Sequence, residues 1–117
     1  DVVLVLAPLT HDKKGNMLNT NADTIAGEVA KALSKHFEVT LTYCFEKKGV
    51  LLDAANEDSV IKKINHSQFE EYVKKGIITE GMIPKLENAF AAINTGVKQV
   101  IITRADQIGE PCGTTIQ

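Results

Sequence analysis

Two segments of the chain place polar or charged side chains at the start of predicted helices. The segment Asn19-Thr-Asn-Ala-Asp23 offers an amide and a carboxylate, and Gly81-Met-Ile-Pro-Lys85, much later in the chain, offers a lysine. The N-terminus of a helix carries unpaired backbone N–H groups and a partial positive charge, so it favours an anionic ligand. Together these residues predict a site that holds an anion or a nucleotide and neutralises its charge.

These residues also have ordinary structural explanations. The segment Thr20-Asn-Ala-Asp23 has the form of a capping box, and an acidic residue in the first turn stabilises a helix through its dipole. Lys85 lies beside the apolar stripe of its helix and could extend into solvent. A lysine so close to a helix N-terminus opposes the dipole, however, and a bound phosphate would explain its position. Both explanations stay open on the sequence alone.

A charged segment between Phe45 and Asp58, centred on Lys47-Lys48-Gly49, is expected to form a loop that faces a ligand. The P-loop pattern G-x-x-x-x-G-K-[ST] and the pattern G-x-G-x-x-G are both absent from the sequence, so these phosphate-binding motifs are excluded. Cys44 and Cys112 stand alone without the spacing of metal ligands, and no metal site is predicted. We interpret them as reduced thiols of a cytoplasmic protein.

Apolar patterns predict the elements that would position these residues. Strands are expected at residues 2–7, 16–19, 39–44, 98–103 and 114–117, the last at a sheet edge, and helices at 22–36, 67–75 and 81–94. The run at 2–7 is apolar throughout, as in a strand covered on both faces. A turn at 11–16, followed by the short strand at 16–19, would form a hairpin. Strands that alternate with helices predict an α/β fold with a mainly parallel sheet between helices.

Periodic apolar positions predict the buried faces of two helices. The stripes are Ile25, Val29, Leu33 and Phe37 in the first helix, and Ile83, Leu86, Phe90, Ile93 and Val97 in the third. The second helix is expected to begin with a capping box formed by Ser67 and Glu70.

Length and composition limit the class of protein. The 117 residues fit a single domain, residues 1–117, and 44% hydrophobic with only 5% aromatic residues indicates an aliphatic core. The net charge is −2 and Arg104 is the only arginine, so no nucleic-acid partner is expected. The longest apolar run is too short to span a bilayer, so no membrane association is predicted. The chain begins without Met and directly in a strand of buried type, and we expect it to be a fragment.

Four motifs resemble the amino-acid kinase family, and the resemblance extends over almost the whole chain. They are Asn19-Thr-Asn-Ala-Asp-Thr-Ile-Ala-Gly27, Gly49-Val-Leu51, Ile77-Ile-Thr-Glu-Gly-Met-Ile-Pro-Lys-Leu-Glu-Asn88 and Ala92-Ile-Asn-Thr-Gly96. The long motif around Lys85 is similar to the N-acetylglutamate kinase branch of the family. The resemblance implies the C-terminal, ATP-binding half of such a kinase. The N-terminal half, with its Lys-x-Gly-Gly phosphate loop, glycine-rich substrate loop and substrate-binding arginine, would lie outside this chain.

The resemblance also implies roles for particular residues. Asn19 would bind the acylated glutamate, Asp23 would hold catalytic lysines, and Lys85 would stabilise the transition state on the ATP side. Nucleotide contacts would come from Glu46, Lys47, Lys48, Gly49, Val50, Leu51, Ile77, Ile78 and Thr79. The family usually has Thr-Asp-Val-Pro-Gly-Val-Leu where this chain has Cys44-Phe-Glu-Lys-Lys-Gly-Val-Leu51, one residue longer, so the nucleotide loop departs from the pattern.

The implied reaction transfers phosphate from ATP to the γ-carboxylate of an N-acylglutamate in arginine biosynthesis, with Mg²⁺ carried on the phosphates. Such a reaction needs positioning and charge neutralisation, which a lysine oriented by an aspartate can supply. The full-length enzyme is expected to be a homo-oligomer. Two alternatives remain: another amino-acid kinase with a different carboxylate, carbamate or phosphate acceptor, and a non-catalytic nucleotide-binding module that regulates a partner.

Overall fold

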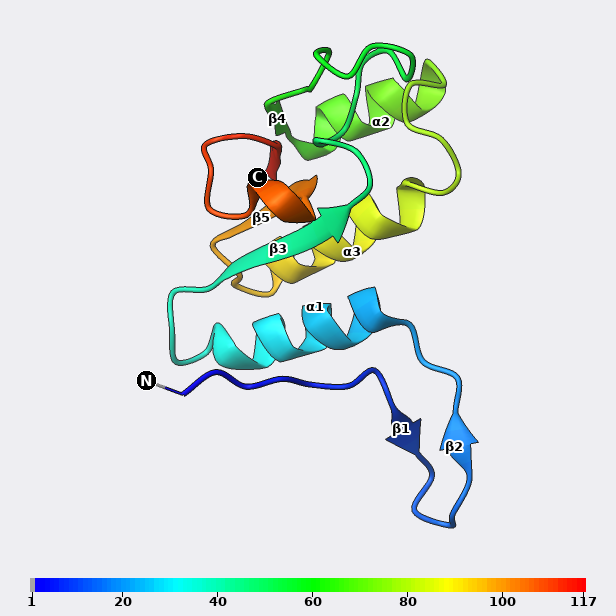
Figure 1. The fold of residues 1–117 in the computed structure, drawn as a ribbon, viewed down its shortest axis with the longest axis vertical. Coiled ribbons are helices and arrows are strands. Elements are labelled where there is room, and N and C mark those ends of the chain that lie inside the picture. The colour runs from blue at the N-terminus through cyan, green and yellow to red at the C-terminus, as the bar shows by residue number, and fades with distance from the viewer. Residues whose placement is uncertain (1) are drawn as a thin grey trace.

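The computed structural model describes residues 2–117, and their arrangement is shown in Figure 1. In chain order the elements are β1 (Thr10–His11), β2 (Met17–Leu18), α1 (Ala22–Leu33), β3 (Thr40–Phe45), β4 (Lys63–Ile64), α2 (His66–Lys74), α3 (Ile83–Asn94), β5 (Gln99–Arg104), the 3₁₀ turn η1 (Ala105–Gln107) and β6 (Thr114–Ile116). The strands β1 and β2 form a hairpin at the predicted turn, although its first strand is Thr10–His11 and not the predicted strand 2–7. The other strands form a four-stranded sheet in the order β3-β5-β6-β4. None of the helices in this part of the chain is long and apolar enough to cross a membrane.

The sheet is mainly parallel and flanked by helices, as predicted. Strand β3 runs parallel to β5, with Tyr43 opposite Ile102, and β4 runs parallel to β6. The pair β5–β6 is antiparallel. The prediction that the last strand lies at an edge of the sheet is wrong. This strand, β6, lies between β5 and β4, and β4 forms the edge. This partner strand has two residues, which is too short to give a periodic signal in the sequence.

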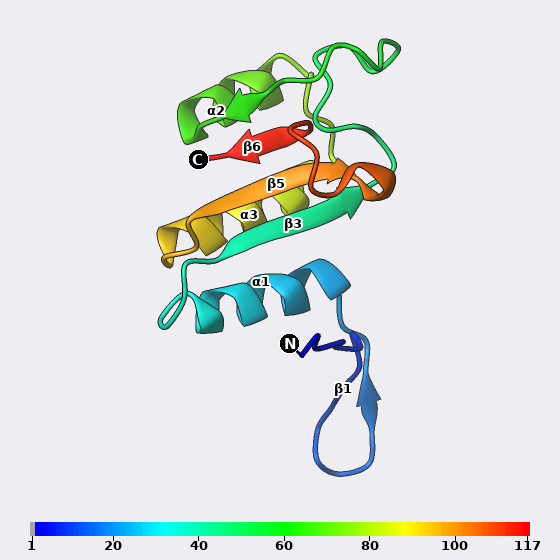
Figure 2. The same ribbon diagram turned by 60° about the vertical axis from the view of Figure 1, so that its left-hand side comes forward.

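Helix α3 lies at the centre of the helical layer and contacts α1, α2, β5 and β6 (Figure 2). Alternate residues of the strands supply the apolar face that these helices cover, since successive side chains point to opposite sides of a sheet. The buried apolar strand residues are Leu41, Tyr43, Ile64, Val100, Ile102 and Ile116. On α3 the predicted stripe is confirmed at Leu86 and Phe90, which are both buried. Each fully buried aliphatic side chain stabilises the fold by about 1.5–3 kcal/mol relative to its exposed state.

The predicted stripe on α1 does not form the buried face of that helix. The buried residues of α1 are Gly27 and Ala30, whereas Leu33 and Phe37 are 44% and 66% exposed and the helix ends at Leu33. Small residues let α1 approach its neighbours closely: a Cβ at Gly27 would lie 3.3 Å from the hydroxyl of Tyr43. The larger apolar residues of α1, Ile25, Val29 and Leu33, instead line a groove together with residues of the N-terminal segment.

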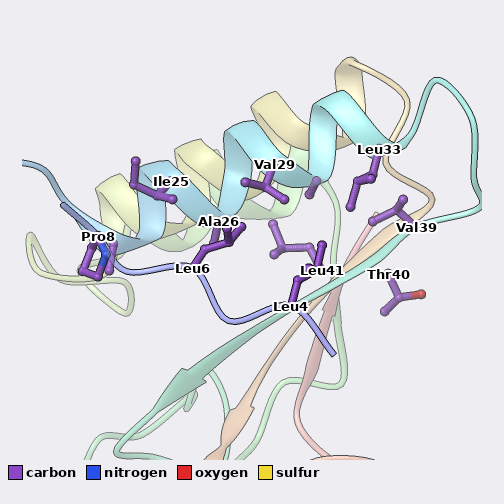
Figure 3. A pocket seen from close by; sticks show the side chains of 12 residues that line it. Leu4, Leu6, Pro8, Ile25, Ala26, Val29, Leu33, Val39, Thr40 and Leu41 are labelled. Carbon is purple, nitrogen blue, oxygen red and sulfur yellow. The ribbon is translucent and has the colours of Figure 1, made fainter. Parts of the chain in front are cut away.

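The predicted strand at residues 2–7 is wrong. The segment is extended but has no ladder partner among the described residues, and Val5 is 91% exposed. Figure 3 shows Leu4 and Leu6 beside α1, where they line a groove of about 340 Å³ together with Val29 and Leu41. A strand that is apolar on both faces requires neighbouring strands to pair with, and the described part of the chain supplies none here.

Helix α2 begins one residue earlier than predicted and with a different cap. The side chain of Asn65 accepts a hydrogen bond from the N–H of Gln68 at 2.9 Å, and the Gln68 side chain accepts one from the N–H of Asn65 at 3.0 Å. This reciprocal pair is a capping box, so the predicted Ser67–Glu70 box is wrong.

Candidate active site

The start of α1 is capped by Asn21, and this leaves the carboxylate of Asp23 available for other contacts. The Asn21 side chain accepts a hydrogen bond from the N–H of Asp23 at 2.8 Å. The predicted capping box of Thr20 and Asp23 is therefore wrong, because the Thr20 hydroxyl bonds that of Thr10 instead. Asp23 still lies in the first turn, where the helix dipole favours a negative charge.

Lys85 lies in the first turn of α3 and forms an ion pair with Asp23 through its Nζ and the Oδ2 atom of the carboxylate. The side chain of Lys85 is only 14% exposed and that of Asp23 is 32% exposed. The explanation of Lys85 as a solvated surface lysine is thus excluded. The structure brings together two residues that the sequence predicted as catalytic partners.

Tyr43, on β3, lies against both members of this pair. Its hydroxyl donates a hydrogen bond to the backbone carbonyl of Asp23 at 3.1 Å, and Lys85 Nζ lies 5.3 Å from the centre of its ring. Burial of the Tyr43 hydroxyl, together with the nearby charge of Asp23, raises its pKa to about 12. Three elements that are separate in the sequence, α1, β3 and α3, therefore meet at one charged cluster, which consists of Asp23, Tyr43 and Lys85.

A cavity of about 190 Å³ lies between the loop that follows β3 and the segment that leads into α3. Its walls are formed by Phe45, Glu46, Lys47, Gly49, Val50, Leu51, Ala54, Ile77, Ile78, Thr79 and Met82. All of the predicted nucleotide-binding residues except Lys48 contribute to this lining. Lys48 instead lies 3.4 Å from the carboxylate of Asp58, in an ion pair. The two predicted segments, 46–51 and 77–79, thus come together around one hollow.

The loop that forms one wall of the cavity is attached to the last strand. The N–H of Val50 donates a hydrogen bond to the hydroxyl of the buried Thr114 at 2.8 Å. A Cβ at Gly49 would lie 2.7 Å from that same hydroxyl and 2.9 Å from Val60, so only glycine permits this approach. Thr114 was predicted only as a strand residue, and no pattern in the sequence marks its contact with the loop.

The cavity and the charged cluster share two elements. Met82 lines the cavity and lies one turn before Lys85 on α3, while Phe45 lines it and lies two residues after Tyr43 on β3. An apolar hollow whose walls lie on the same elements as a largely buried cation could receive a flat apolar group, with an attached anion directed toward the cation. Asn19 is exposed in the segment between β2 and α1, close in sequence to Asp23.

Comparison with known proteins gives consistent matches along the chain. The family described as "Amino acid kinase family" matches residues 1–104. The chain is 67% identical over 115 residues to a protein of Parabacteroides distasonis named acetylglutamate kinase. This match covers 98% of this chain and 45% of that protein. It is 64% identical over 116 residues to the acetylglutamate kinase of Bacteroides fragilis, with 99% of this chain and 44% of that protein covered.

The fold also matches a solved structure from Streptococcus mutans with a TM-score of 0.76 and 39% sequence identity. That match covers 96% of this chain and 41% of the other. The chain therefore spans less than half the length of the curated relatives and of the solved structure that it resembles.

Proposed function

The chain belongs to the amino acid kinase family, and we propose that it supplies the nucleotide-binding half of a cytoplasmic enzyme of arginine biosynthesis. The enzyme would use ATP to phosphorylate the γ-carboxylate of N-acetylglutamate or a related N-acylglutamate. The observation that carries this proposal is the ion pair between Lys85 and Asp23, together with a cavity that is lined by residues predicted to contact nucleotide and by Met82, one turn before Lys85. The relatives named acetylglutamate kinase support the choice of acceptor.

In this proposal Lys85 is the catalytic cation. Transfer of a phosphoryl group spreads negative charge over the equatorial oxygens, and a fixed ammonium group stabilises that charge without reorganisation of solvent. Asp23 would hold the ammonium of Lys85 in place through the ion pair between α1 and α3. The exposed amide of Asn19, on the segment that leads into α1, would bind the acylated amino acid.

The cavity would hold the adenosine part of ATP. Its lining includes Val50, Leu51 and Ile78, whose apolar side chains can contact the faces of a base. At about 190 Å³ it is smaller than the pockets of about 300–1,000 Å³ that enclose a whole ligand, so the phosphates would extend toward Lys85. Residues 2–117 contain no cluster of His, Cys, Asp and Glu that could hold a metal ion by itself. Mg²⁺ would be carried on the nucleotide phosphates, since it is usually bound by one or two carboxylates together with substrate phosphates.

The missing N-terminal half is the partner that this proposal requires. Strand β3 pairs with β5 on one side, and no described strand pairs on its other side. The neighbouring groove presents Ile25, Val29 and Leu33 of α1 together with Leu4, Leu6 and Pro8 of the N-terminal segment (Figure 3). Contiguous apolar surface of this kind is typical of a face that another part of a protein covers. The unpartnered edge and the groove support a continuation of the fold on this side.

The test compares the full-length protein that contains this chain with the chain alone. The full-length protein is expected to form ADP and an acyl phosphate from ATP and N-acetylglutamate, detected as a hydroxamate. The 117-residue chain is expected to be inactive, because positioning of both substrates is worth about 7–11 kcal/mol and requires both halves. Activity of the full-length protein on another carboxylate, carbamate or phosphate acceptor in place of N-acylglutamates would contradict the choice of acceptor. Nucleotide binding without any transfer would instead indicate a regulatory module.

A further inference from the structure

Tyr43 touches both members of the predicted catalytic pair, yet the proposed reaction does not involve it. We propose that Tyr43 is a positioning residue: its hydroxyl fixes the first turn of α1 and its ring fixes the ammonium of Lys85, so that the pair has one geometry. This inference rests on the proposed function and extends it to a residue that is only 3% exposed and lies behind the ion pair.

The hydroxyl of Tyr43 acts on the backbone that carries Asp23. It donates a hydrogen bond to the Asp23 carbonyl at 3.1 Å and so links β3 to the first turn of α1. A buried hydroxyl is costly unless it is hydrogen-bonded, so this contact resists any movement of the helix start away from β3. Because burial raises the pKa of Tyr43 to about 12, the group remains a neutral donor at physiological pH.

A glycine in α1 makes room for this contact. Gly27 lies one turn after Asp23, and a Cβ there would lie 3.3 Å from the Tyr43 hydroxyl. Glycine in a helix interior is destabilising relative to alanine, so a position of this kind needs a reason in the packing. The reason here is the close approach of α1 to the tyrosine.

The ring of Tyr43 acts on Lys85. Lys85 Nζ lies 5.3 Å from the centre of the ring, within the distance at which a cation is attracted to an aromatic face. Tyr43 itself is 3% exposed and belongs to β3, whose ladder with β5 pairs it with Ile102. A side chain on a paired strand is a rigid support, and geometry held by rigid elements is more precise than geometry held by loops.

The experiment separates the two contacts in the full-length enzyme. Tyr43→Phe keeps the ring and removes the hydroxyl, and we expect kcat to fall about 3- to 10-fold, the usual effect of one lost hydrogen bond, while the KM for ATP stays within about 2-fold. Tyr43→Leu removes both contacts and is expected to lower kcat about 10- to 100-fold. The matched control is Tyr72→Phe, at the only other tyrosine of the chain, which should retain the wild-type kcat.

A spectroscopic measurement detects the ring contact independently of turnover. In protein labelled at lysine Cε, the Lys85 signal, assigned by its loss in Lys85→Arg, should be shifted upfield by the ring. The shift should persist in Tyr43→Phe and vanish in Tyr43→Leu. An active wild type whose two Tyr43 variants keep full kcat, or whose Lys85 signal is unshifted, would overturn this inference alone. A wild type that transfers no phosphate to any acylglutamate would overturn the proposed function and this inference with it.

Discussion

Lys85 of α3 and Asp23 of α1 form an ion pair although they are 62 positions apart in the sequence. Each lies in the first turn of its own helix, where the dipole favours the aspartate and disfavours the lysine. The aspartate therefore compensates a cation that its own helix does not stabilise. A partly buried cation in such a position remains strongly attractive to an anionic ligand, which is the property that a kinase site requires.

Lys85→Ala in the full-length enzyme is expected to lower kcat about 10²–10³-fold, the usual effect of removing one preorganised charged or hydrogen-bonding group. The KM for ATP should rise much less, because the charge is most useful when negative charge redistributes in the transition state. Steady-state kinetics measure both quantities. An unchanged kcat with a raised KM would show that Lys85 only binds nucleotide.

Asp23→Asn is expected to reduce kcat by a similar factor, since a neutral amide cannot hold the ammonium of Lys85. It should hardly affect folding, because the helix cap is Asn21 and not Asp23. The matched control is Asn21→Ala, which should cost about 1 kcal/mol of stability and leave kcat near the wild-type value. The thermal midpoint and kcat of the two variants distinguish a role of Asp23 in catalysis from a role in helix stability. A lowered midpoint with normal turnover in Asp23→Asn would assign the carboxylate a purely structural role.

Much of the site could be predicted from the sequence because its residues carry local signals. The spacing of Leu86 and Phe90 identified α3 and thereby placed Lys85 near a helix start. Tyr43 could not be recognised, since a tyrosine in an alternating strand reads as an ordinary core residue. Its importance depends on α1 and α3 lying on the same side of β3, and this relationship is tertiary.

Two wrong predictions about the fold, the strand at residues 2–7 and the buried face of α1, concern features that depend on contacts with other elements. Residues 2–7 have strand composition, but a strand needs a ladder partner and the described chain supplies none. The period-four pattern of α1 is real, yet Val29 and Leu33 face the groove while Gly27 faces the core. Hydrophobicity predicts which residues avoid water but does not reveal that two elements must approach closely enough to require a glycine.

Nucleotide binding can be tested on the 117-residue chain by NMR titration with ATP or ADP. Amide signals of Gly49 and Thr79, which line the cavity, should shift before that of Gly109, which lies outside it. The affinity should be weak, because the phosphates lack the loop expected from the N-terminal half. Uniform shifts, or shifts confined to the C-terminal residues, would contradict the assignment of the cavity.

Thr114→Val tests the attachment of the nucleotide loop to the last strand. The change keeps the shape of the side chain but removes the acceptor for the N–H of Val50, and a buried unsatisfied donor costs about 1–3 kcal/mol. We expect faster hydrogen exchange at the Val50 amide and weaker ATP binding. The control is Thr115→Val on the same strand, where the side chain is half-buried rather than fully buried. Equal exchange rates at Val50 in wild type and Thr114→Val would refute the attachment.

Alkaline pH should destabilise the chain through Tyr43. The pKa of its hydroxyl is raised to about 12 by burial and by the charge of Asp23, against about 10 in an unfolded chain. The unfolded state therefore loses its proton first. The contribution of the protonated Tyr43 hydroxyl to the free energy of unfolding is fully present below about pH 10 and disappears as the pH rises through about 12. Tyr43→Phe has no proton to lose, so the stability advantage of the wild type over this variant should shrink across that interval.

The neighbouring charges, Asp23 and Lys85, are present in both proteins and largely cancel in the comparison. Urea unfolding of both proteins at about pH 8 and about pH 11 measures the difference. A difference in unfolding free energy that is the same at both values would mean that the Tyr43 hydroxyl ionises as readily in the folded chain as in the unfolded one.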